Sequence, residues 1–137
     1  MNEKELVLNH VKIIFSELTD KGFGRNITID VTDPKVQQEI SDWAKYNNVQ
    51  GGAPKFKKYE GKDGKVTMQY SLKISDYTKI EGKDGLGEAN LGYGAVVNLI
   101  ARAFEYNNKF GSGVSASLAG IYVIEPAIDT TMSKIAE

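Results

Sequence analysis

The chain has 137 residues, of which 41% are hydrophobic and 26% charged, and its formal net charge is −1 at pH 7. This length suits a single domain, and the composition is that of a globular protein rather than a disordered one. Cysteine is absent, which excludes disulfides and thiolate chemistry and favours a reducing compartment. The near-neutral charge argues against a surface that is basic throughout but allows a local basic patch.

The sequence also bears on location. No apolar run approaches the roughly 20 residues that a membrane helix needs. The first residues, "MNEKELVLNHVKIIF", lack an apolar block followed by a small-residue cleavage site, so we expect no secretory signal peptide. We therefore expect the protein inside the cell, with no membrane partner.

The first part of the chain reads as two strands separated by a turn. Apolar residues alternate with others in 8–18 and again in 26–31, the pattern of strands with one buried face. The turn is expected at 20–24, "DKGFG". The side chains expected to face inward are Val11, Ile13, Phe15, Ile27, Ile29 and Val31.

A helix is expected over 34–47. Asp33 is a good N-cap, and Pro34 suits the first helical position because its missing N–H costs nothing there. Apolar residues then recur at helical spacing, which predicts a core-facing stripe of Val36, Ile40, Trp43 and Ala44. We therefore expect Trp43 in the core rather than on a binding surface.

Residues 49–65 read as a loop, and a third strand follows over 65–75. Its inward positions are expected to be Val66, Met68, Tyr70, Leu72 and Ile74. Its outward positions are Thr67, Gln69, Ser71 and Lys73, a polar surface suited to a nucleic-acid backbone.

The glycine-rich run 81–94 reads as a flexible connection. It contains no P-loop pattern, and Asn90 stands where G-x-G-x-x-G needs its third glycine. A strand rather than a helix follows it, so no helix N-terminus is available to an anion. Strands are expected over 95–106 and 113–125, and Pro126 ends the sheet.

Five strands and one helix predict a mainly β fold, a five-stranded OB-fold barrel with the α-helix between the second and third strands. A β-sandwich is the alternative, although a single central helix fits it less naturally. We expect one OB-fold domain over 1–126, followed by a short C-terminal tail over 127–137.

Signals for catalysis are weak. His10 is the only histidine, and the sequence around it suggests neither a Ser-His-Asp nor a Cys-His arrangement. Histidine and cysteine are too scarce to bind a metal, and the acidic residues lack the spacing of a calcium loop. The sequence therefore predicts a protein that is not an enzyme, with no cofactor and no metal.

Two stretches suit single-stranded nucleic acid, which needs cations for phosphates and flat rings for bases. The first is a basic island that interleaves lysines with two aromatics: Lys55, Phe56, Lys57, Lys58, Tyr59, Lys62 and Lys65. Its alternative is a solvated loop whose aromatics fold back onto the barrel.

The second stretch is the end of the fourth strand and the turn that follows. There the small side chains Val97, Leu99, Ala101 and Ala103 share one parity and suit a barrel interior. Arg102, Phe104 and Tyr106 then face outward, with Lys109 and Phe110 in the turn. Phe110 either touches a base or plugs the end of the barrel.

Over about 10–125 the chain resembles the small OB-fold single-stranded-DNA-binding proteins of tailed bacteriophages. The resemblance lies in "RNITIDVTDPKVQQEISDWAKYNN", "PKFKKYEGKDGKVTMQYSLKIS" and, most specifically, "GYGAVVNLIARAFEYNNKFGSGVSASLAGIYVIE". It implies coating of single-stranded DNA during phage replication and recombination, in the cytoplasm of the bacterial host. Replication or recombination proteins are further implied partners, and self-association is left open.

The resemblance also implies site residues. Phe104 and Tyr106 match aromatics along the DNA path, and Lys73 joins the basic island as a phosphate contact. Gln69 and Ser71 stand where relatives can carry lysine, which weakens such contacts. The ending "EPAIDTTMSKIAE" lacks the long acidic tail by which many relatives recruit enzymes.

The sequence thus predicts a non-enzymatic, sequence-independent single-stranded-DNA-binding protein. The alternative is an OB-type module that binds a protein or an oligosaccharide. The predicted contacts are Lys55, Phe56, Lys57, Lys58, Tyr59, Lys62, Lys65, Gln69, Lys73, Arg102, Phe104, Tyr106, Lys109 and Phe110.

Overall fold

The computed structural model describes residues 5–18, 24–61 and 63–128, and this part of the chain is mainly β. It contains one α-helix, α1 (Pro34–Asn47), and a six-stranded sheet. The strands are β1 (Glu5–Glu17), β2 (Asn26–Asp30), β3 (Lys57–Glu60), β4 (Val66–Gly82), β5 (Val96–Asn108) and β6 (Gly111–Glu125). The predicted class, mainly β with a helix after the second strand, is confirmed.

Strand β3 corrects the prediction of five strands and of a continuous loop over 49–65. All four of its side chains are exposed, so its sequence carries no alternation of buried and exposed positions. It pairs with the first residues of β4 and lies at the edge of the sheet.

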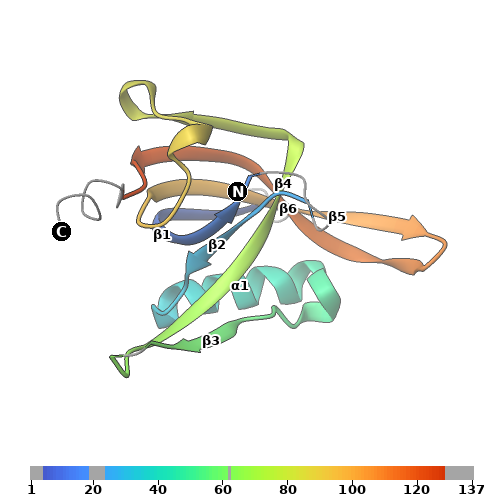
Figure 1. The fold of residues 1–137 in the computed structure, drawn as a ribbon. Helices are drawn as coiled ribbons and strands as arrows, with labels where there is room; N and C mark the ends of the chain where they lie inside the picture. The colour runs from blue at the N-terminus through green and yellow to red at the C-terminus, as the bar shows by residue number, and fades with distance from the viewer. Residues whose placement is uncertain (1–4, 19–23, 62, 129–137) are drawn as a thin grey trace.

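The pairing of the strands closes a ring. Hydrogen-bonded neighbours follow the order β2-β1-β5-β6-β4-β3, and β2 also pairs with β4. Five strands therefore form the ring, and β3 is attached to β4 outside it. The β4–β6 pair is parallel, and the other pairs are antiparallel. The distal part of the β5–β6 hairpin, residues 104–113, extends beyond the ring, and we call it the hairpin arm (Figure 1).

The helix begins and packs as its sequence predicts. The Asp33 carboxylate accepts a hydrogen bond from the Lys35 amide at 2.9 Å, and Pro34 is the first helical residue. Ile40, Trp43 and Ala44 are buried, and the partly buried Val36 packs against the core. The expected place of Trp43 in the core is confirmed. None of the described helices is long and apolar enough to cross a membrane.

Phe15 departs from the expected strand pattern. Val11 and Ile13 are buried as predicted, but the Phe15 side chain is 57% exposed. The register of β1 against β2 shifts between Ile13 and Phe15, which then lies opposite Thr28. Because such an irregularity reverses the alternation of side chains, Phe15 reaches the outer surface.

The glycine-rich connection carries contacts to the chain that follows β6. The Ala127 amide donates to the Asn90 carbonyl at 3.0 Å, and the Ile128 amide donates to the Tyr93 carbonyl at 2.8 Å. The Ile128 side chain covers Gly94, whose φ is +87°. These contacts hold the loop that carries Tyr93 against the ring.

Candidate nucleic-acid interface

The outer side of β4 carries a polar strip made by Thr67, Gln69, Ser71 and Lys73, as the sequence predicts. Facing residues of paired strands project to the same side of a sheet. On one side of the strip, Lys57 lies opposite Gln69 and Tyr59 opposite Thr67. On its other side, the Thr28 and Ser71 hydroxyls form a 2.8 Å hydrogen bond. We call Thr67, Gln69, Ser71 and Lys73 the β4 strip.

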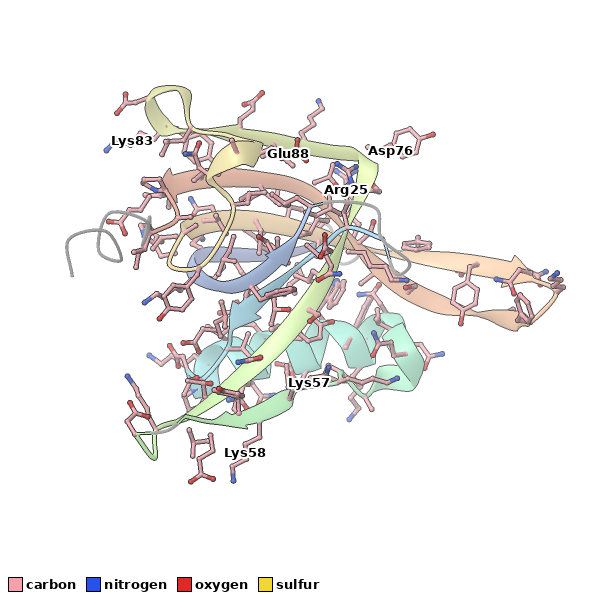
Figure 2. The ribbon with its side chains drawn as sticks, viewed as in Figure 1. Arg25, Lys57, Lys58, Asp76, Lys83 and Glu88 are labelled. Atoms are coloured by element: carbon pink, nitrogen blue, oxygen red, sulfur yellow. The ribbon has the colours of Figure 1, made fainter. Side chains whose placement is uncertain are left out.

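The two lysines of β3 lie on opposite faces of that strand. Lys57 shares the face of Gln69, whereas Lys58 is paired with Met68, a residue that packs against the core. Figure 2 shows both on β3, on the side of the molecule away from Arg25. The register therefore separates Lys58 from the β4 strip, although the sequence groups it with Lys57.

A groove of about 590 Å³ lies beside the β4 strip, between β1, β3 and β4. Exposed and half-buried side chains from distant segments line it, including Lys12, Tyr59, Lys65, Gln69 and Tyr93. Tyr59 and Tyr93 are each 58% exposed, and the Lys12 ammonium lies 5.8 Å from the centre of the Tyr93 ring. We call it the β3 groove. It offers two rings and two ammonium groups to one ligand.

Two carboxylates also line the β3 groove, and both accept hydrogen bonds from nearby backbone. Asp30 accepts from the Thr32 amide and Asp63 from the Lys65 amide, each at 2.9 Å. Their charges repel phosphate, so the groove is electrostatically mixed. Its lysines attract anions, and its tyrosines present flat apolar faces.

The aromatic pair of the basic island is divided by the structure. Phe56 packs edge-on against Tyr70 with ring centres 5.6 Å apart and is partly buried against the core. Tyr70 is 3% exposed, as expected from the sequence, and its burial raises the pKa of its hydroxyl. Phe56 thus folds back onto the core, whereas Tyr59 stays available. Lys55 and Lys65 are exposed, and Lys62 lies outside the described residues.

The predicted parity of the β5 end is observed. Ala101 is buried and Ala103 packs against the core, while Phe104 and Tyr106 are 44% and 42% exposed. Arg102 is also exposed, and its guanidinium pairs with the Glu5 carboxylate at 3.2 Å. The hairpin arm therefore presents two rings on one side, with Arg102 next to its base.

Phe110 lies at the tip of the hairpin arm and is 87% exposed, so it does not plug the end of the ring. The Lys109 ammonium lies 5.1 Å from the centre of its ring. This contact is a cation–π pair at an exposed site, worth about 0.5–1 kcal/mol.

Residues of the basic island line the β3 groove, whereas Phe104 of the hairpin arm lines other grooves, so these grooves do not join the two. A row of paired residues connects them instead. Lys73 lies opposite Asn26 on β2 and opposite Ser117 on β6, and Ser117 lies opposite Arg102 on β5. The end of the β4 strip is thus two strands away from the base of the hairpin arm.

The fold was compared with known proteins. No family model and no curated protein matches the sequence. Three solved structures of one protein, the single-stranded DNA-binding protein from bacteriophage Enc34, match the fold. The chain is similar in fold to this phage protein. The resemblance predicted from the sequence is therefore confirmed at the level of the fold.

The similarity extends over nearly the whole chain. One Enc34 structure matches with a TM-score of 0.65 and 15% identity, over 97% of this chain and 91% of that chain. A C-terminal truncation gives 0.60 and 16%, and a complex with single-stranded DNA gives 0.57 and 14%. Each of these two covers 93% of this chain and 89% of the other.

Sequence reasoning missed several exposed groups of the surface. Lys12 and Tyr93 reach the β3 groove from segments far from the basic island, and only the closed ring brings them there. Phe15 reaches the outer surface through a backbone irregularity. These placements depend on contacts between distant segments, so no local sequence pattern indicated them. Among the described residues, no group of three or more histidine, cysteine or acidic side chains is placed to hold a metal ion.

Proposed function

We propose that the protein is an OB-fold, sequence-independent single-stranded-DNA-binding protein without enzymatic activity. The observation that carries this proposal is the β4 strip, which joins two clusters of exposed rings and cations through Lys73. The fold of the Enc34 protein, which has been solved with single-stranded DNA, supports it. The proposed setting is phage DNA replication and recombination in the host cytoplasm.

The mechanism divides the strand between cations and rings. Lys57, Lys65 and Lys73 contact phosphates, and the strand gains affinity because the neutralised phosphates release counterions. Tyr59, Phe104 and Tyr106 stack on bases, each contributing on the order of 1–3 kcal/mol. The hydroxyl and amide groups of the β4 strip donate hydrogen bonds to the backbone between these contacts.

This arrangement explains why the binding is expected to ignore sequence. Every base has a flat face, so stacking on a tyrosine or phenylalanine distinguishes bases weakly. Gln69 and Ser71 carry no charge. This part of the strip therefore holds the DNA by hydrogen bonds and neutralises no further phosphate charge.

Titration of labelled oligo-dT by fluorescence polarisation tests the proposal. The variant Phe104→Ala with Tyr106→Ala is expected to bind at least about tenfold more weakly, because two stacking rings are lost. Tyr122→Ala is the matched control, since Tyr122 on β6 is 45% exposed and lies outside the proposed contacts. Unchanged affinity of the double variant contradicts the stacking assignment. Absence of wild-type binding at low salt contradicts the function itself.

A further inference from the structure

A second groove, of about 550 Å³, lies farther along β4 than the β3 groove, beside β5 and β6. Its floor is the stretch 117–120 of β6, where the residues are small except for Leu118, whose side chain is buried. One wall comes from β4, with Ser75, Tyr77 and Lys79. The other wall comes from β5, with Arg102 and Phe104. We call it the β6 groove.

Tyr77 is the feature of this groove that the fold does not explain. Its side chain is 91% exposed, the largest exposure of the described aromatic residues. The backbone beneath it is nevertheless well fixed. The Tyr77 amide donates to the Ser75 hydroxyl at 3.2 Å, and the Thr78 hydroxyl donates to the Leu118 carbonyl at 2.6 Å. The molecule thus fixes the backbone that carries this exposed ring.

The charges around the β6 groove are mixed, and most of them are paired. Lys79 lies opposite Gly120 at its edge, and Arg102 is on the other wall. The nearby Asp76 carboxylate is paired with Arg25 at 3.2 Å, and Arg25 also holds Glu88 at 3.1 Å (Figure 2). The Arg102 charge is partly offset by Glu5, and Glu81 limits the favourable region at the end beyond Lys79. Among the described residues, the ion pairs engage Arg25 and Arg102, so Lys79 is the lining cation that has no acidic partner and is left to contact an anion.

The β6 groove continues the β4 strip. Along β4, Lys73 is followed by Ser75, which lines the groove, and then by Tyr77 and Lys79. Lys73 is also paired with Ser117 on the groove floor. The register of β4 against β6 shifts between Ile74 and Lys79, and β4 bends there (Figure 1), so a strand that passes Lys73 enters the groove at this bend.

We propose that the β6 groove binds a second segment of the same DNA strand, with Tyr77 and Phe104 stacking on bases from opposite walls and Lys79 contacting a phosphate. This inference rests on the proposed function. The first segment lies along the β3 groove and the β4 strip, and the second follows after Lys73. Long strands use both segments, whereas a strand of a few nucleotides uses only one.

A length series of oligo-dT tests the inference. Site sizes on OB folds range from about 4 to about 16 nucleotides, so oligomers of about 5 and about 16 nucleotides bracket the two cases. The variant Tyr77→Ala with Lys79→Ala is expected to bind the long oligomer about tenfold more weakly and the short one within about twofold of wild type. For the long oligomer, the slope of log K against log salt is expected to fall by about 0.7, because one phosphate contact is lost.

Two controls accompany the test. Tyr122→Ala and Lys83→Ala remove an exposed ring and an exposed ammonium outside the proposed region, and both are expected to bind as wild type. Circular dichroism and thermal unfolding check that the variants fold. Wild-type affinity of the double variant for both lengths overturns the inference. Equal losses at both lengths overturn the division into two segments. Lack of wild-type binding at either length is a failure of the proposed function instead.

Discussion

Tyr106 on β5 lies opposite Gly113 on β6, and its ring fills the space that a side chain at position 113 needs. A Cβ atom added at Gly113 would lie 2.8 Å from the Tyr106 hydroxyl oxygen and 3.1 Å from the Tyr106 Cζ atom. The glycine thus determines where this ring of the hairpin arm rests.

Gly113→Ala is therefore expected to displace the Tyr106 ring and to weaken oligo-dT binding. The loss is expected to reach at most that of Tyr106→Ala, since the ring can still move to a new position. The measurement is a double-mutant cycle, in which Gly113→Ala has little further effect once Tyr106 is alanine. Additive losses from the two substitutions contradict the link between them.

Gly94 supports the loop that carries Tyr93. Its φ is +87°, and a Cβ atom there collides with the Ile128 side chain. Gly94→Ala is expected to lower the free energy of unfolding by about 2–4 kcal/mol, from backbone strain plus the clash. Urea unfolding measures this loss of free energy.

Gly85 is the matched control for that substitution. Its φ is also +87°, but nothing lies within 4 Å of an added Cβ atom. Gly85→Ala is expected to lower the free energy of unfolding only by the backbone strain, about 1–2 kcal/mol. Equal losses for the two variants contradict a structural role for the contact between Ile128 and Gly94.

Lys57 and Lys58 are neighbours in sequence but lie on opposite faces of β3. Lys57→Ala is expected to reduce the salt slope of oligo-dT binding by about 0.7, because it removes one phosphate contact. Lys58→Ala is expected to leave the slope unchanged. Polarisation titrations at several salt concentrations measure both, and a larger effect at Lys58 contradicts the assigned path.

Burial raises the pKa of Tyr70 above its ordinary value of 10.0. As the pH rises, the unfolded chain therefore loses the Tyr70 proton before the folded chain does. The contribution of the protonated Tyr70 side chain to the free energy of unfolding is complete below pH 10.0 and falls above it. Tyr70→Phe is expected to show a shallower fall in the free energy of unfolding between about pH 9 and 11. Tyr122→Phe, at an exposed position, is expected to follow wild type. Parallel curves for Tyr70→Phe and wild type contradict this account.

Local sequence signals predicted α1 and the alternation of β5, whereas β4 runs to Gly82, beyond the expected strand over 65–75. The bounds of α1 follow from Asp33 and Pro34 at its start and the two asparagines at its end. The orientation of Arg102 and Phe104 follows from strict alternation along β5. In both cases the determining residues lie within the element or directly next to it.

The structure departs from the sequence prediction where pairing between strands determines which segments form strands and which side chains are exposed. Phe15 is exposed because β1 shifts its register against β2, a backbone event without a residue pattern of its own. Strand β3 has four exposed side chains, so only its partner β4 makes it a strand. The β3 groove and the β6 groove combine residues from separate segments, and these are brought together by closure of the ring.

The most direct test of the account is the binding of labelled oligo-dT by the wild-type protein at about 50 mM and about 200 mM salt. We predict saturable binding at the lower concentration and clearly weaker binding at the higher one, because lysine contacts to phosphates release counterions. Absence of binding at low salt, or an affinity that does not change with salt, contradicts the proposed function.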